Sequence, residues 1–142
     1  MLNELALNIE LGSDLAEVGR IRRDGMWVGR IRRIGTAKLR LWGLPSTVVD
    51  DAELLISELV TNALQHGTAR EISFRFILSA DLLLIMVDDR SPGRPLVRDS
   101  SPDDESGRGM FLVEAIAAAW GVSPDETRTW CALTTHTTGG PR

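Results

Sequence analysis

The stretch that most constrains the fold covers residues 50–67, DDAELLISELVTNALQHG. Its apolar side chains return at three- and four-residue steps, so the pattern predicts one amphipathic helix with a broad apolar face. The central row of this face is Leu55, Leu59 and Ala63. Asp50 and Asp51 suit the positive N-terminal end of such a helix, and Gly67 suits the left-handed position that closes it. We expect the rest of the chain to be organised around this helix.

Two polar residues, Glu58 and Asn62, interrupt the regular pattern of this helix. They lie four residues apart, and therefore on one face, close to the apolar stripe. One interpretation is a surface hydrogen-bonded pair, which is common on any helix. The other is a metal and nucleotide site, in which Asn62 offers a neutral carbonyl oxygen to a hard cation such as Mg²⁺ and Glu58 orients or deprotonates a hydroxyl. The helix alone leaves both interpretations open.

Size and composition favour one ordinary globular domain, which we assign to residues 1–142. The chain is 43% hydrophobic and 25% charged, and its formal net charge of −4 argues against a general nucleic-acid binder. A single cysteine, Cys131, excludes an internal disulfide and any zinc site built from several cysteines. No apolar run is long enough to span a bilayer and the N-terminus lacks a signal pattern, so we expect no membrane partner and a cytoplasmic location.

The N-terminal third predicts a strand followed by a basic, mostly helical region. Residues 3–11 alternate between apolar and polar, as in a half-buried strand. Residues 14–44 hold eight of the sixteen basic residues. Asp24-Gly25 is a turn signal, so we expect a break there, a short strand at residues 26–28 and then a helix that ends at Gly43. The arginines could form a docking surface for an acidic partner, but a solvated helix face is the favoured interpretation.

The chain after residue 67 predicts two strands that pair in antiparallel fashion. Residues 71–78 alternate at first, whereas residues 82–87 are continuously apolar, as in a strand buried on both faces. The second strand runs into Asp88-Asp89, which is either a solubilising turn or the floor of a pocket where one carboxylate accepts a hydrogen bond from an exocyclic amine such as that of adenine. Gly93 in the following turn would let the backbone pass close to a ring.

The C-terminal third predicts a loop, a helix, a hairpin and a tail. Residues 94–106 are polar and rich in turn formers, which we interpret as a mobile lid. Residues 106–120 predict a buried helix whose starting glycines could present free backbone N–H groups to phosphate, although a single Gly-x-Gly is weak evidence. Residues 121–133 predict a closing hairpin, and residues 134–142 a flexible tail.

Three stretches, in this order, resemble the motifs of the ATP-binding GHKL superfamily, which includes gyrase, Hsp90, histidine kinases and MutL. Residues 57–67 (SELVTNALQHG) are similar to its N box, residues 89–93 (DRSPG) to its G1 box and residues 107–113 (GRGMFLV) to its G2 box. The closest match is the small single-domain bacterial branch, the anti-sigma factor serine kinases. The resemblance covers about residues 26 to 133, and the N box is its most specific motif.

This resemblance implies a role for each matching residue. Asn62 would coordinate the Mg²⁺ that bridges the phosphates, and Glu58 would be the catalytic base. Asp89 would accept a hydrogen bond from the adenine amine, and Gly93 would leave room for the ring. The residues expected to face the phosphates from the lid and the helix start are Gly107, Arg108, Gly109 and Met110.

The implied fold is an α+β, two-layer sandwich of the Bergerat type, with a mixed, mostly antiparallel sheet and helices on one face. The implied function is an ATP-dependent serine/threonine kinase that phosphorylates a small anti-anti-sigma-like antagonist and binds a sigma factor, with homodimers allowed. Two departures, Ser91 in place of a glycine and Thr127-Arg128 in place of a lysine, favour an alternative, a non-catalytic ATP-binding module that regulates a partner by docking. A module without nucleotide that contacts nucleic acid through the basic segment 20–40 is disfavoured by the acidic net charge.

Overall fold

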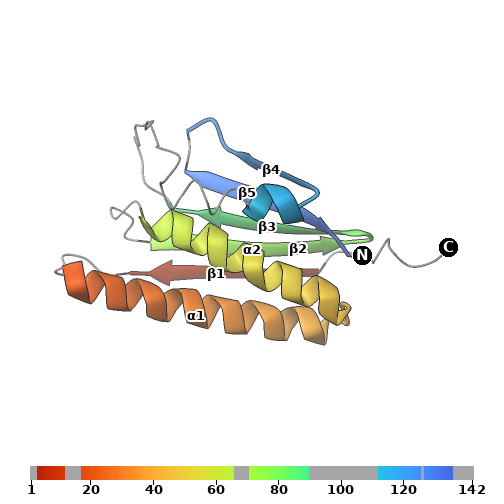
Figure 1. Ribbon diagram of the computed structural model, residues 1–142, viewed down its shortest axis with the longest axis horizontal. Helices are drawn as coiled ribbons and strands as arrows, with labels where there is room; N and C mark the ends of the chain where they lie inside the picture. The colour runs from red at the N-terminus through yellow and green to blue at the C-terminus, as the bar shows by residue number, and fades with distance from the viewer. Residues whose placement is uncertain (1–2, 12–16, 66–70, 90–111, 126, 136–142) are drawn as a thin grey trace.

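The protein is a two-layer α+β structure, as predicted. The computed structural model describes residues 3–11, 17–65, 71–89, 112–125 and 127–135. Its elements, in chain order, are β1 (Asn3–Glu10), α1 (Glu17–Leu41), α2 (Ser46–Gln65), β2 (Glu71–Ser79), β3 (Leu82–Asp88), β4 (Ala119–Val122) and β5 (Arg128–Thr134). A short helical turn covers residues 112–116. The two long helices lie side by side over one face of the sheet (Figure 1).

The sheet has the strand order β1-β2-β3-β5-β4, and every neighbouring pair of these strands is antiparallel. Strand residues alternate between the two faces, so β2 turns one set of side chains towards the helices. In β2 this set contains Ile72, Phe74 and Phe76, all of which are fully buried. The predicted strand at residues 3–11 and the predicted pair that follows residue 67 are confirmed.

The prediction that the second strand of this pair is buried on both faces is wrong. In β3, Leu83, Ile85 and Val87 are buried against the helices, whereas the alternate side chains are exposed or half-buried. Leu82, at the start of the strand, is 41% exposed. The described helices cover only one face of the sheet, so the continuous apolar run packs on one side and leaves an open face on the other (Figure 1).

The prediction of a break at Asp24-Gly25 is also wrong, because α1 runs without interruption through both residues. Residues 26–28, predicted as a short strand, lie inside this helix. Asp24 is held on the helix by Arg23 at 2.9 Å and by Arg20 one turn earlier at 3.7 Å. The Arg20–Asp24 pair has the i, i+4 spacing that supports a helix, and packing of an apolar stripe outweighs the modest cost of one internal glycine.

Helix α1 is held by apolar side chains and ends next to Gly43, as the sequence predicts. Ile31 and Leu39 are fully buried in the core shared with α2 and the sheet. Gly43 then adopts a φ of 85°, and the N–H of Leu44 donates to the carbonyl of Leu39 at 3.2 Å. This is the hydrogen-bond pattern of a helix closed by a left-handed residue, which glycine adopts most easily.

The central helix, α2, begins at Ser46, ahead of the amphipathic stretch at residues 50–67 and within one or two residues of Ser46 or Thr47, which the sequence offers as its N-cap. Ser46 is already helical, and the carbonyl of Pro45 accepts hydrogen bonds from the N–H groups of Val48 and Val49, both at 3.0 Å. The first turn therefore contains no acidic residue, and Asp50 and Asp51 lie in the second turn rather than at the positive end. Nine apolar side chains of α2 are buried, as its pattern predicts. Its predicted end, Gly67, lies outside the described residues.

The predicted helix at residues 106–120 is wrong at its C-terminal end. Helical structure in its described part covers residues 112–116, and Ala119 already belongs to β4. The N–H of Ala118 donates to the carbonyl of Ala132 at 2.8 Å, so sheet pairing replaces the helix there. The predicted hairpin is confirmed, because β4 pairs with β5. Of the predicted tail, Thr134 lies in β5 and residues 136–142 are outside the described part.

Replacing Gly25 by alanine is expected to raise the free energy of unfolding by about 0.5–1 kcal/mol. Gly25 lies inside α1, and a Cβ placed on it meets nothing within 4 Å, so the variant gains helix propensity without strain. Urea denaturation followed by tryptophan fluorescence measures the change. The matched control is Gly43→Ala: a Cβ there also meets open space, but the φ of 85° should make this variant less stable by roughly 1–2 kcal/mol. Destabilisation by Gly25→Ala would contradict the prediction.

Candidate functional site

The end of α2 and the end of β3 lie at the same end of the fold. Only residues 66–70 separate Gln65, the last residue of α2, from Glu71, the first residue of β2. In the antiparallel pairing of β2 and β3, Ser73 lies opposite Asp88, so the end of β3 is beside the start of β2. Figure 1 shows both ends on the left side of the view. Connectivity and register therefore bring the last turns of α2 and the end of β3, with Asp89, to one region.

Glu58 and Asn62 share a flank of α2 that is turned away from α1. The flank towards α1 is identified by Glu53, whose carboxylate lies 3.4 Å from the Arg32 guanidinium, and by Thr61 and Leu64, which line a groove with α1. With 3.6 residues per turn, Glu58 and Asn62 point to the other side of the helix. Both are half-buried beside the apolar face. The structure thus places them together, as the i, i+4 spacing predicts.

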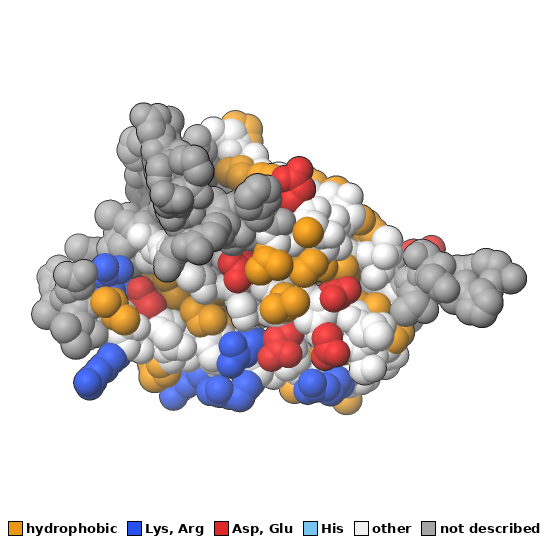
Figure 2. All heavy atoms as spheres, in the orientation of Figure 1, with side chains coloured by type: hydrophobic (Ala, Val, Ile, Leu, Met, Phe, Trp, Pro, Cys, Tyr) orange, Lys and Arg blue, Asp and Glu red, His pale blue; other side chains and the backbone are white. Residues whose placement is uncertain are grey.

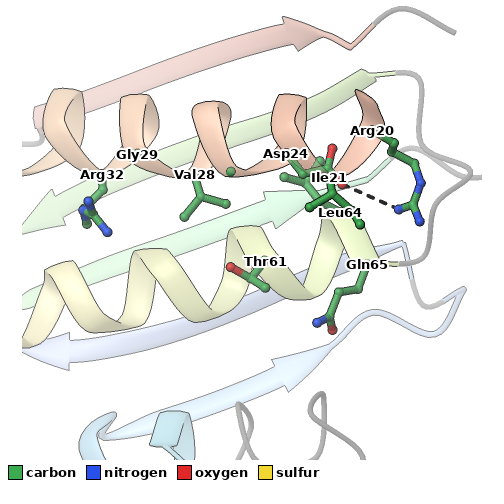
Figure 3. A pocket seen from close by; sticks show the side chains of 10 residues that line it. Arg20, Ile21, Asp24, Val28, Gly29, Arg32, Thr61, Leu64 and Gln65 are labelled. Carbon is green, nitrogen blue, oxygen red and sulfur yellow. Dashed lines mark ion pairs between the residues drawn. The ribbon is translucent and has the colours of Figure 1, made fainter. Parts of the chain in front are cut away.

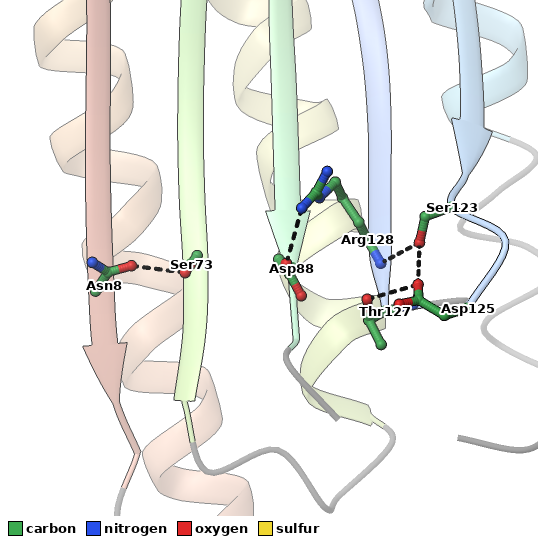
Figure 4. Close-up of polar contacts among 7 residues, drawn as sticks. All are labelled: Asn8, Ser73, Asp88, Ser123, Asp125, Thr127 and Arg128. Atoms are coloured by element: carbon green, nitrogen blue, oxygen red, sulfur yellow. Dashed lines mark hydrogen bonds and ion pairs between the residues drawn. The ribbon is translucent and has the colours of Figure 1, made fainter. Parts of the chain in front are cut away.

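The two carboxylates after β3 have different environments. Asp88 points to the open face of the sheet, where its carboxylate lies 3.5 Å from the Arg128 guanidinium (Figure 4). Asp89 is only 3% exposed, and its N–H donates to the carbonyl of Thr127 at 2.8 Å. Alternation along the strand turns Asp89 towards the helical side. Of the two acids, Asp89 is therefore the one on the side of Asn62.

A turn between β4 and β5 supports the backbone next to Asp89. The Asp125 carboxylate accepts hydrogen bonds from the hydroxyls of Ser123 at 2.7 Å and Thr127 at 2.9 Å, and from the N–H of Thr127 at 3.2 Å (Figure 4). These bonds, the one from Ser123 first, lower the pKa of the Asp125 carboxyl below its usual range. The turn fixes Thr127, whose carbonyl in turn holds Asp89. This role of Asp125 is not among the sequence predictions, although Ser-x-Asp-x-Thr is a recognisable turn signal.

Arg128 does not take the place of the lysine expected near the phosphates. Its ion pair with Asp88 lies on the open face, and the candidate site lies on the helical side of the sheet. Strand parity explains this position, because Arg128 lies directly opposite Asp88 in the β3–β5 ladder. A cation at the γ-phosphate would have to come from another part of the chain.

The remaining predicted site residues lie outside the described residues. They are Gly93, Gly107, Arg108, Gly109 and Met110, and the predicted lid at residues 94–106 lies outside as well. In the part of the chain that the structure describes, no group of three or more His, Cys, Asp or Glu could hold a metal ion. A single amide oxygen such as that of Asn62 still suits Mg²⁺, which usually keeps several waters and takes other ligands from substrate phosphates.

Cys131 is a core residue. Its side chain is fully buried opposite Ile85, and burial raises the pKa of the thiol to about 12. A thiol with such a pKa carries almost no thiolate at neutral pH, so it is not a nucleophile.

The geometry defines a class of protein: a single antiparallel sheet under two helices, with an acid at a strand end and a Glu–Asn pair on the adjacent helix. Residues 26–134 match the sequence model of the histidine kinase-like ATPase domain. Because this match covers most of the chain, the protein belongs to the histidine kinase-like ATPase family, the GHKL group that the sequence motifs resemble. No curated protein matches the sequence.

Members of this family bind ATP, usually together with Mg²⁺, so the protein is an ATP-binding domain of the regulatory type. The match begins at residue 26, inside α1, and thus leaves out β1 and the first turns of that helix. None of the helices in the described part of the chain is long and apolar enough to cross a membrane.

Proposed function

We propose that this protein is an anti-sigma factor-type serine/threonine kinase that uses ATP and Mg²⁺ to phosphorylate a small antagonist partner. A sigma factor is the second, alternating partner. The observation that carries the proposal is the position of Glu58 on the same flank of α2 as Asn62, at the end of the fold where β3 delivers Asp89. The match to the histidine kinase-like ATPase domain supports ATP as the phosphate donor.

In this proposal each residue has a separate task. The buried carboxylate of Asp89 accepts a hydrogen bond from the exocyclic amine of adenine, which selects adenine over guanine. The carbonyl oxygen of Asn62 is a ligand for Mg²⁺, which when bound neutralises charge on the phosphates. Glu58 accepts the proton of the attacking serine hydroxyl. The serine oxygen forms a bond to the γ-phosphorus, and the bond between the γ-phosphorus and the β-phosphate oxygen breaks, which releases ADP.

A second candidate function is an ATP-binding module without catalysis. Phosphoryl transfer depends on positive charge at the γ-phosphate, and Arg128 points to the opposite face of the sheet. In such a module, nucleotide binding would only set the shape of a docking surface. The two candidates share the proposed nucleotide contacts of Asn62 and Asp89 and differ in whether Glu58 acts on a substrate.

Nucleotide binding is tested by calorimetric titration with ATP and Mg²⁺. Asp89→Asn is expected to weaken ATP binding by roughly tenfold to a hundredfold, because it replaces a charged acceptor for the adenine amine by a neutral amide, in which an NH2 donor takes the place of one of the two acceptor oxygens. Asn62→Ala should weaken binding in Mg²⁺ and have a smaller effect in EDTA. The matched control is Asp88→Asn, which changes the neighbouring acid on the open face and should leave ATP affinity unchanged.

Two outcomes would count against the proposal. If the wild-type protein binds no adenine nucleotide, both candidate functions fail. If Asp88→Asn weakens binding as much as Asp89→Asn, the assignment of the adenine contact to Asp89 fails. Circular dichroism of each variant separates these results from a loss of folding.

A further inference from the structure

The surface of α1 differs from the rest of the protein in its charge. Within Glu17–Leu41 there are eight Lys and Arg against two acids, whereas the whole chain has sixteen basic and twenty acidic residues. Figure 2 shows Lys and Arg side chains gathered along the edge formed by α1, with most Asp and Glu above them over α2. Such segregation creates a local positive field on an acidic protein.

The same helix exposes apolar side chains that a purely solvated face would not need. They are Ile21, Met26, Ile34 and Leu41, at 59%, 45%, 43% and 75% exposure. Single exposed apolar residues are ordinary, and by helix geometry Met26, Ile34 and Leu41 point to the other side of α1 from Ile21. Ile21 is the one that lies beside basic side chains in the groove between α1 and α2, where the surface is both cationic and apolar. The interpretation of the arginines as a solvated face therefore leaves this combination unexplained.

A groove of about 510 Å³ runs between the first half of α1 and the last turns of α2. Its apolar lining comes from Ile21, Val28 and Leu64, with Thr61 and Gln65 on the α2 side (Figure 3). Gly25, where a Cβ would meet open space, leaves it wide in the middle. On α2 the groove is lined by Thr61, Leu64 and Gln65, whereas Glu58 and Asn62, one turn before Thr61 and Gln65, do not line it.

Two arginines mark the ends of the groove, Arg20 at one end and Arg32 at the other (Figure 3). Arg20 lies 3.7 Å from Asp24, whose carboxylate is closer to Arg23 at 2.9 Å. Arg32 lies 3.4 Å from Glu53, and both side chains are about 40% exposed. The exposed Arg32–Glu53 pair contributes little, so the Arg32 guanidinium can exchange Glu53 for another carboxylate. Asp24 is only 17% exposed but is held more closely by Arg23 than by Arg20, so the Arg20 guanidinium can also contact a second carboxylate.

We propose that this groove docks an acidic segment of a partner protein, which inserts apolar side chains beside Ile21, Val28 and Leu64 and places carboxylates at Arg20 and Arg32. Charge complementarity selects an acidic occupant, and the apolar lining selects a protein segment rather than a nucleic-acid backbone. The 59% exposure of Ile21 shows that the groove is open, as an extended or helical segment requires. The inference deepens the partner-binding part of the proposed function and needs no bound nucleotide.

The test uses fluorescence anisotropy with labelled synthetic peptides and the full chain in the absence of nucleotide. The probe is an amphipathic peptide of glutamate and leucine; one comparison peptide replaces leucine by serine and another replaces glutamate by lysine. Wild-type protein should bind the glutamate–leucine peptide at least about tenfold more tightly than either comparison peptide. Gly25→Trp, which fills the groove, and Arg20→Glu should each weaken this binding by about tenfold.

The matched controls are Gly25→Ala, which adds a side chain too small to fill the groove, and Arg40→Glu, which makes the same charge change at the other end of α1. Both should bind the peptide like the wild type. Equal weakening by Arg40→Glu, or equal binding of the serine peptide, would show diffuse electrostatic attraction and overturn the proposal. Tighter binding to duplex DNA or to anionic lipid vesicles, lost in Gly25→Trp, would overturn the choice of occupant.

The calorimetric titration with ATP separates this inference from the nucleotide proposal. Gly25→Trp should bind ATP like the wild type, because Gly25 lies on α1 and the groove that it lines contains neither Glu58 nor Asn62. If the wild type binds ATP but does not bind the glutamate–leucine peptide, the docking proposal fails and the nucleotide proposal stands. Peptide binding without ATP binding refutes the nucleotide site alone.

Discussion

Glu58→Gln is expected to lower the rate of phosphoryl transfer to the partner by about 10²–10⁴-fold while ATP affinity stays nearly constant. Glutamine keeps the size of the side chain and its place on α2, but it cannot accept the proton of the attacking hydroxyl. Because the base acts in the transition state and makes no direct contact with adenine, the effect belongs to turnover rather than to binding. Transfer of labelled phosphate from ATP to a cognate partner measures the rate, and calorimetry measures the affinity.

The control for this variant is Glu53→Gln on the same helix. Glu53 is a half-exposed carboxylate that lies 3.4 Å from Arg32, on the flank towards α1, so its loss should leave transfer unchanged. If Glu58→Gln transfers phosphate as fast as the wild type, Glu58 is not the catalytic base. A wild-type protein that binds ATP but transfers no phosphate would favour the non-catalytic module.

Phe76→Ala is expected to lower the free energy of unfolding by about 3–5 kcal/mol. Phe76 is fully buried at the point where both helices meet the sheet: a Cβ on Gly35 of α1 would lie 3.0 Å from its ring and 3.0 Å from the Ile56 methyl of α2. Its ring also packs edge-to-face on Phe74, with centroids 4.9 Å apart. Domains are typically stable by only about 5–15 kcal/mol, so this variant should be largely unfolded on mild heating.

Urea denaturation followed by tryptophan fluorescence measures this loss. The comparison is Leu82→Ala, which truncates a side chain that is 41% exposed at the start of β3 and should cost less than about 1 kcal/mol. If Phe76→Ala lowers the free energy of unfolding by less than about 1 kcal/mol, other contacts hold the helices to the sheet.

Much of the fold could be predicted because its elements carry strong periodicity. The buried face of α2 follows its three- and four-residue steps, and β2 alternates as its sequence does. Local signals misled us where tertiary packing outweighed them. Asp24-Gly25 is a turn signal, yet the buried Ile31 and Leu39 keep α1 continuous across it. The alanine-rich run before Trp120 favours helix, yet pairing with β5 makes its end a strand.

The candidate site divides in the same way. The spacing of Glu58 and Asn62 already put them on one face, because helix geometry is local. The sequence shows that Asp88 and Asp89 point to opposite faces of the sheet, but it does not show which of them faces the helices. That depends on the pairing of the strands and on which face of the sheet the helices cover.

The sequence by itself indicated the family, the amphipathic character of α2 and the common face of Glu58 and Asn62, because motifs and helical spacing are properties of neighbours along the chain. Only the tertiary structure decided that Asp89 rather than Asp88 lies on the side of that pair, that Arg128 points away, and that the basic helix borders a groove. These facts depend on residues far apart in sequence, and it is packing of the two helices on one face of the sheet that brings them together.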